Sequence, residues 1–220
     1  MDAIKVCDLF DLTHTRAAKM LAACEYPWEA LSKIGETVLA IGQGLDPSDY
    51  DHPAEDVWIA KTATVATTAS IAGPCVIGEK TEVRPGAFIR GNALVGDGAV
   101  VGNSCELKNC ILFDEVQTPH YNYVGDSVLG YKAHMGAGAV TSNVKGDKKN
   151  VVVHGERDYE TGRKKFGAML GDFAEIGCNS VLNPGTIIGR DSQVYPLSSV
   201  RGVVKARHIV KGARGAFAKN

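Results

Sequence analysis

The chain has 220 residues, of which 45% are hydrophobic, 22% charged and 7% aromatic, a composition that excludes disorder and collagen and suits one main domain with an appendage. Its 24 Lys and Arg residues nearly balance its 25 Asp and Glu residues, so the net charge of −1 gives no overall attraction to nucleic acid or to an anionic membrane. The 25 Gly residues predict a backbone that turns often, which favours β structure.

Targeting signals and cysteine spacing indicate a cytoplasmic protein. The first residues lack the charged, apolar and cleavage regions of a signal peptide, and no apolar run approaches the roughly 18 residues of a membrane span. The six cysteines show no CxxC spacing and no dense framework, so we expect free thiols in a reducing compartment.

Residues 1–56 are predicted to form an N-terminal helical arm. Acidic side chains outnumber basic ones by eleven to four over the segment 1–58, which is therefore acidic. Helix-forming residues dominate the segment 13–44, in which Pro27 stands where a helix would start and Gly44 where one would stop. We expect this arm to cap an open end of the following domain, with a partner-docking role as the alternative.

Apolar residues recur every six positions in the segment 57–206. The first run continues from Ile59 without a miss and the second starts at Leu170. Its members are Ile59, Val65, Ile71, Ile77, Val83, Ile89, Val95, Val101, Leu107 and Phe113, then Leu170, Ile176, Leu182, Ile188, Val194, Val200 and Ala206. A step of six fits neither a helix nor a simple amphipathic strand, but it fits a coil of short strands and corners. The pattern predicts an all-β solenoid, in which three hexads make one triangular turn and each inward aliphatic residue stacks on the copy three hexads later.

The repeat breaks twice, and solenoid breaks often carry binding loops. Regular hexads stop between Phe113 and Val124 and again within an insertion at 144–168. The second break is expected to be a short hairpin in which 151–153 pairs with 159–161, or else a floppy loop. Residues 207–220 are expected to form a basic C-terminal tail.

Long cations stand at positions that the repeat otherwise keeps small. Arg90 and Lys108 are separated by three hexads, so we expect them to stack in successive coils. Because two like charges roughly 5 Å apart repel, this pair suggests an anion such as a phosphate between them, with two solvated cations as the alternative. His120 lies in the first break, where a polar loop would suit a general base.

The stretch VGNSCELKN…PHYNYVGDS…MGAGAVTSN resembles the acetyltransferase domain of the bifunctional N-acetylglucosamine-1-phosphate uridyltransferase/glucosamine-1-phosphate acetyltransferase. Archaeal-type sugar-phosphate nucleotidyltransferases with the same C-terminal domain are more similar still. The resemblance, which covers about 71–200, implies the hexapeptide-repeat superfamily with a left-handed parallel β-helix. It also implies a homotrimer that uses acetyl-CoA as co-substrate, with no metal.

The resemblance further implies the roles of single residues. His120 would be the general base that takes a proton from an amino-sugar amine as the amine attacks the acetyl thioester. The acceptor, an amino-sugar phosphate similar to glucosamine 1-phosphate, would contact six residues: Arg90, Lys108, Tyr123, His134, Asn143 and Lys149. The cofactor would contact another six: Gly136, Ala137, Gly138, Cys178, Arg201 and Lys205. The glycine amides are candidate donors to the tetrahedral oxyanion, and Arg201 and Lys205 are candidates for the CoA phosphates.

Two departures from the family pattern bear on specificity. His134 stands where the bacterial enzymes carry a sugar-binding Asn, and Val144 where they carry a Tyr, so a different amino sugar is expected. Residues 1–58 hold no glycine-rich nucleotide loop, so we expect no uridyltransferase activity. Two alternatives remain open, a non-catalytic trimeric scaffold that binds a sugar phosphate and a carbonic-anhydrase-like zinc enzyme that uses His120 and His134.

Overall fold

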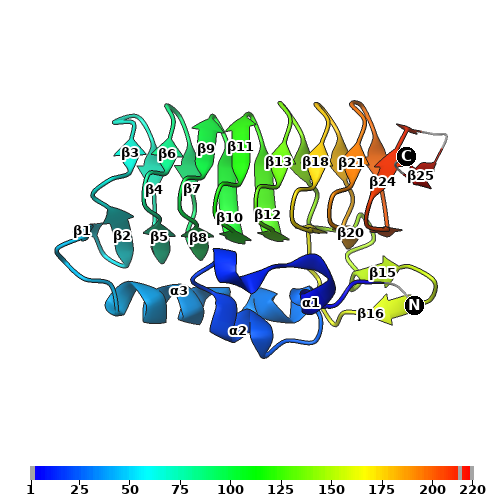
Figure 1. Cartoon of the computed structure of the whole chain (residues 1–220), viewed down its shortest axis with the longest axis horizontal. Helices are drawn as coiled ribbons and strands as arrows, with labels where there is room; N and C mark the ends of the chain where they lie inside the picture. Colours follow the sequence, from blue (N-terminus) through cyan, green and yellow to red (C-terminus); the bar gives the residue numbers. More distant parts are fainter. Residues whose placement is uncertain (1–2, 213–214, 219–220) are drawn as a thin grey trace.

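A long parallel β-solenoid with helices along one side is seen in the computed structural model (Figure 1), which describes residues 3–212 and 215–218. The predicted fold class, an all-β solenoid of hexapeptide repeats with an N-terminal helical arm, is confirmed. No helix among the described residues has the length and apolarity that a membrane span requires.

The strands stack into three faces, each formed by every third strand of the coil. The arm face contains β2 (Val57–Ala60), β5 (Cys75–Ile77), β8 (Ala93–Val95), the second halves of β10 (Glu106–Leu112) and β12 (Tyr123–Leu129), β17 (Ala168–Leu170), β20 (Thr186–Ile188) and β23 (Val203–Val204). The site face contains β4 (Ser70–Ile71), β7 (Phe88–Ile89), the first halves of β10 and β12, β14 (Val140–Thr141), β19 (Val181–Leu182) and β22 (Ser199–Val200).

The third face contains β3 (Thr64–Val65), β6 (Glu82–Val83), β9 (Val100–Asn103), β11 (Gln117–His120), β13 (His134–Met135), β18 (Glu175–Ile176), β21 (Gln193–Val194) and β24 (His208–Val210). Antiparallel strands flank the stack, with β1 (Tyr50–Ala54) on β2 and β25 (Ala216–Ala218) on β24. The parallel coil thus continues through β24, past residue 206 where the sequence predicts a tail.

The first break in the repeat is a one-residue shortening of the coil, so the expected loop is wrong. Leu112, and not Phe113, pairs with Val95. Thr118 then pairs with Val101 and is fully buried, so a polar residue holds the inward position in β11. Its hydroxyl donates a hydrogen bond to the Val100 carbonyl oxygen, which satisfies it inside the core. A two-residue shortening occurs near the end, where Val204, and not Ala206, pairs with Ile188.

The helices of the N-terminal arm lie along the arm face and not over an open end, whereas β1, at the end of the arm segment, covers the edge of the first coil by pairing with β2. The predicted helices are present as α1 (Val6–Leu9), η1 (Leu12–His14), α2 (Ala18–Ala22), η2 (Pro27–Ser32) and α3 (Ile34–Gln43). Helix α3 packs on β5, β8 and β10, and η2 packs on β12. The physical reason is that the outward side chains of this face, Val76, Leu94, Ile111 and Val128, are apolar and need a cover. Each is at most 1% exposed.

The insertion forms an antiparallel hairpin, as one of the two interpretations predicts. In it β15 (Val152–His154) pairs with β16 (Asp158–Glu160), with Val153 opposite Tyr159. The Tyr159 ring lies against Tyr26 and Trp28 of the arm, with ring centroids 5.9 and 6.4 Å apart. The hairpin therefore packs against the arm beside the last coils (Figure 1).

Candidate active site

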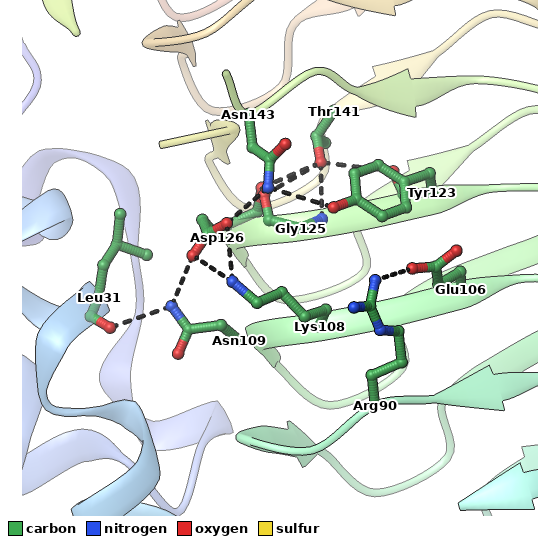
Figure 2. A network of polar contacts seen from close by, with 11 residues as sticks. Leu31, Arg90, Glu106, Lys108, Asn109, Tyr123, Gly125, Asp126, Thr141 and Asn143 are labelled. Atoms are coloured by element: carbon green, nitrogen blue, oxygen red, sulfur yellow. Dashed lines mark hydrogen bonds and ion pairs between the residues drawn. The ribbon is translucent and has the colours of Figure 1, made fainter. Parts of the chain in front are cut away.

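A network of polar side chains lies at the corner between the site face and the arm face (Figure 2). It is built from successive coils, because Arg90 directly follows β7 and Lys108 lies in β10 beside it. In the next coil Lys108 is paired with Gly125 of β12. The predicted stacking of Arg90 and Lys108 in neighbouring coils is therefore present.

Each of these cations is paired with a carboxylate of the chain itself. Arg90 donates to Glu106 at 2.6 Å, and Lys108 lies 3.1 Å from Asp126 Oδ1. The hydrogen bond with Glu106 raises the pKa of the Arg90 guanidinium. The negative charge expected between the cations is thus supplied in part by Glu106 and Asp126. The Arg90 side chain is still 47% exposed, so its other N–H groups face solvent.

Asp126 is the centre of the network. Its side chain is only 5% exposed and accepts hydrogen bonds from Lys108, from Asn109 Nδ2 at 2.9 Å and from Asn143 Nδ2 at 2.6 Å. The Asn143 amide also donates to the Tyr123 hydroxyl oxygen at 3.1 Å. Burial raises the pKa of Tyr123, with the Asp126 charge adding to the shift, so this hydroxyl keeps its proton at neutral pH.

The local backbone explains why Asn109 and Asp126 stand where they do. They occupy the same solenoid corner in successive coils, with φ values of 50° and 48°. Asn and Asp adopt this left-handed conformation more readily than most residues. Asn109 also donates to the Leu31 carbonyl oxygen at 3.1 Å, which ties the network to η2 of the arm (Figure 2).

His120 lies across the next corner of the same coil. It ends β11 and is exposed, whereas Tyr123 starts β12 on the other side of the corner. Buried Asn122 holds the turn, since its side chain accepts from the His120 N–H and donates to the carbonyl oxygens of Gly136 and Ala139. The Gly138 N–H donates to the His120 carbonyl oxygen. His120 and the stretch 136–138 are therefore neighbours.

Contrary to the expectation, the N–H groups of Gly136 and Gly138 are not free to bind an oxyanion. The Gly136 N–H donates to the Ile176 carbonyl oxygen at 2.7 Å, and the Gly138 N–H donates to His120 at 3.0 Å. These bonds belong to the hydrogen-bond ladder between successive coils, so both N–H donors are already used. Gly136 lies against Cys178 of the following coil, since an added Cβ would come within 3.0 Å of the Cys178 sulfur. Gly136 and Cys178, two of the residues predicted to contact the cofactor, are therefore in contact with each other.

His134 lies away from the network, on the third face. It is the outward residue of β13, and its Nδ1 is 2.8 Å from Glu175 Oε2. Lys149 is exposed in the loop before the hairpin, where its backbone N–H donates to the Asp147 carboxylate. Within one copy of the chain, neither residue has a contact with the Asp126 network among the described residues.

Arg201 and Lys205 are held by the hairpin. Arg201 Nη2 lies 3.1 Å from His154 Nε2, and the Nδ1 of that ring is 2.8 Å from Asp158. Lys205 pairs with Glu156 at 3.2 Å. A cavity of about 520 Å³ borders Arg201; its other lining residues are Ser142, Val144, Lys145, Gly146, Asp147, Asn183 and Pro184.

The residues that sequence reasoning missed are the acceptors and turn amides around the predicted ones. Asp126 lies 18 residues after Lys108, which is a numerical signal, although the shortened coil pairs Lys108 with Gly125 and stacks Asp126 on Asn109. Asn109 and Asn122 carry no such signal, since their roles depend on the arm and on the corner. Within residues 3–212 and 215–218, no group of three or more His, Cys, Asp and Glu side chains could hold a metal ion.

Comparison with known proteins confirms the predicted resemblance. Residues 71–157, which include the Asp126 network and His120, match the family described as the GMPPB C-terminal domain. The bifunctional sugar-1-phosphate nucleotidylyltransferase/acetyltransferase of Sulfurisphaera tokodaii is 37% identical over 95 residues, or 42% of this chain and 23% of that protein. The bifunctional protein GlmU of Methanococcus maripaludis is 35% identical over 92 residues, or 42% of this chain and 22% of that protein. The chain thus spans less than a quarter of the length of these relatives.

Among solved structures, perosamine N-acetyltransferase from Caulobacter crescentus, determined with CoA and GDP-perosamine, has a TM-score of 0.40 and 18% identity. The match covers 74% of this chain and 56% of that one.

Proposed function

We propose that this protein is an acetyl-CoA-dependent N-acetyltransferase whose acceptor is an amino-sugar phosphate, and the proposal assigns it no uridyltransferase step. The observation that carries the proposal is that Lys108 and Asn143 meet at Asp126, with Tyr123 bonded to Asn143 and Arg90 on the preceding coil. His120 lies across the corner from Tyr123. The Sulfurisphaera tokodaii relative supports the reaction class, since its name includes an acetyltransferase activity.

In this proposal the cations bind the sugar phosphate. The Arg90 guanidinium has five N–H donors, of which the bond to Glu106 uses one. Its exposed N–H groups and the Lys108 ammonium would together meet phosphate oxygens.

His120 would then act as the general base. The sugar amine attacks the thioester carbonyl carbon, the C–N bond forms, and the C–S bond of acetyl-CoA breaks. The proton lost by the amine passes to His120 and then to the departing thiolate, which leaves as CoA. No described side chain hydrogen-bonds the His120 ring, so the ring is free to reach a substrate nitrogen.

Two further parts of the proposal concern the cofactor and the assembly. Arg201 and Lys205 would meet CoA phosphates after leaving the hairpin side chains that hold them, and residues 136–138 with Cys178 would lie beside the thioester. In a homotrimer, His134 and Glu175 on the third face of one subunit could complete the acceptor site of the next. The third face and the site face lie on different sides of each solenoid, so the third face of one subunit can meet the site face of its neighbour.

The test is thiol release from acetyl-CoA by the purified protein with a panel of amino-sugar 1-phosphates. We expect release that requires both an amine acceptor and His120, with His120→Ala lowering kcat by about 10²- to 10⁴-fold. The matched control is His52→Ala, since His52 is exposed and stacks on Trp58, outside the network. Full turnover by His120→Ala would contradict the base assignment, and CoA binding without release across the panel would contradict this choice of acceptor.

A further inference from the structure

The hydrogen-bond polarity of the acceptor site is determined by Asp126. An ionised Asp carries no donor, so every neighbour within hydrogen-bond distance must present an N–H or O–H group to it. Asn143 approaches Asp126 Oδ2 to 2.6 Å, and therefore its Nδ2 and not its Oδ1 must face the carboxylate. The chemistry of the two groups therefore determines the orientation of the amide.

The consequence is that both N–H groups of Asn143 are already used. One donates to Asp126 and the other to the Tyr123 oxygen at 3.1 Å. The amide oxygen then points away from the carboxylate, and no residue in the described part of the chain donates to it. Because Tyr123 accepts this bond, its own O–H proton is left to donate. The pair thus offers one acceptor and one donor.

Gly125 makes this arrangement possible. A Cβ at position 125 would overlap the Tyr123 hydroxyl oxygen and lie 2.9 Å from Asn143 Nδ2. Only a residue without a side chain lets the hydroxyl and the amide meet above β12. The position of the Tyr123–Asn143 pair therefore depends on the space that Gly125 leaves and on the hydrogen bond from Asn143 to buried Asp126.

We propose that Asp126 is a positioning residue that keeps the Asn143 amide oxygen outward, so that the site selects an acceptor with a hydroxyl or ammonium donor at Asn143 and an oxygen at Tyr123. This inference rests on the proposed function, and it specifies the substrate further. An amino sugar with two oxygens on adjacent positions meets both requirements, because one hydroxyl can donate to the Asn143 oxygen while the neighbouring oxygen accepts from the Tyr123 hydroxyl. A deoxy analogue that lacks the hydroxyl would leave the Asn143 oxygen unpaired, which such sites reject strongly.

The test compares the parent amino-sugar phosphate with its monodeoxy analogues on wild type and on Asp126→Asn. In wild type we expect one analogue to lose at least about tenfold in kcat/KM. In Asp126→Asn the new amide can donate to Asn143 and turn it round, so that N–H groups point outward. We expect the parent to lose about 10- to 100-fold in kcat/KM, the analogue to lose less, and the gap between them to close to within about threefold. The KM for acetyl-CoA should stay within about threefold of the wild-type value.

Asp172→Asn is the matched control. Asp172 is also buried and accepts from two backbone N–H groups and Arg190, but at a different corner of the solenoid. We expect it to lower the melting temperature without changing the gap between parent and analogue. Equal losses for the parent and every analogue in Asp126→Asn would overturn the inference, as would the same pattern in Asp172→Asn.

Calorimetric titration of the same ligands without acetyl-CoA separates this inference from the proposed function. If wild type binds the amino-sugar phosphates but transfers no acetyl group, the proposed reaction is wrong, and the ratio of dissociation constants for parent and analogue still judges the role of Asp126. If wild type binds none of them, both are wrong.

Discussion

Replacing Gly125 with Ala tests how closely the acceptor site is packed. The added Cβ would lie 2.7 Å from Tyr123 Cζ, where ordinary contacts begin at 3.4 Å, so the ring must move by about 0.7 Å or more. Because φ at this position lies outside the left-handed region, the backbone itself accepts Ala. The ring is the mobile partner, and its movement breaks the 3.1 Å bond between Asn143 and Tyr123.

The magnitudes follow from these two effects. Ala in a strand is favoured over Gly by about 0.5–1 kcal/mol, whereas the steric overlap costs about 1–3 kcal/mol, so the free energy of unfolding falls by about 0–2.5 kcal/mol. Loss of one neutral hydrogen bond, together with a displaced Tyr123, raises the acceptor KM by about three- to tenfold. The KM for acetyl-CoA stays unchanged.

Steady-state kinetics with both substrates, together with thermal unfolding, measure these changes. The matched control is Gly44→Ala, since a Cβ there would lie 3.5 Å from its nearest neighbour and the residue caps α3 outside the network. An unchanged acceptor KM in Gly125→Ala would refute the role of the Tyr123–Asn143 pair.

Three further predictions concern the arm, the thiols and the hairpin. Ile111→Ala removes a side chain that is 1% exposed under the arm and should lower the free energy of unfolding, measured in urea, by about 2–5 kcal/mol. Gln193→Ala, at an exposed position, should lower it by about 0.5 kcal/mol or less. Similar losses in the two variants would contradict the covering role of the arm. Burial raises the pKa of Cys110 to about 12. Iodoacetamide at pH 8 should therefore modify exposed Cys178 and leave Cys110 unmodified until urea unfolds the chain, which mass spectrometry measures. Labelling of Cys110 in the folded protein would argue against the fold. Arg201→Gln should raise the dissociation constant for acetyl-CoA more than that for desphospho-CoA, and equal effects would argue against phosphate contact.

The period of six residues determined the solenoid and the stacking of its coils. An inward aliphatic residue at each sixth position leaves few other folds, because no helix or flat sheet repeats at that interval. The same period places Arg90 beside Lys108, but it fails at the next coil, where the one-residue shortening pairs Lys108 with Gly125 and stacks Asp126 on Asn109. Family resemblance then named Tyr123 and Asn143, which the structure brings to that carboxylate.

The tertiary structure alone decided the register, the arm and the orientation of several side chains. On the arm face both inward and outward residues are apolar, so the pattern could not show that Leu112 rather than Phe113 continues the stack. The arm lies along the coils because it covers this face, a contact that no local pattern encodes. Asn109 reaches Leu31 through that contact.

His134 shows the limit of inference from resemblance. Its place one residue before Met135 makes it an outward residue of the third face, whereas Tyr123 projects from the site face. Local sequence determines which residues project from a solenoid, because side chains alternate inward and outward along each short strand. Which projecting residues meet is decided by long-range packing, through the lengths of the coils, the arm and the hairpin.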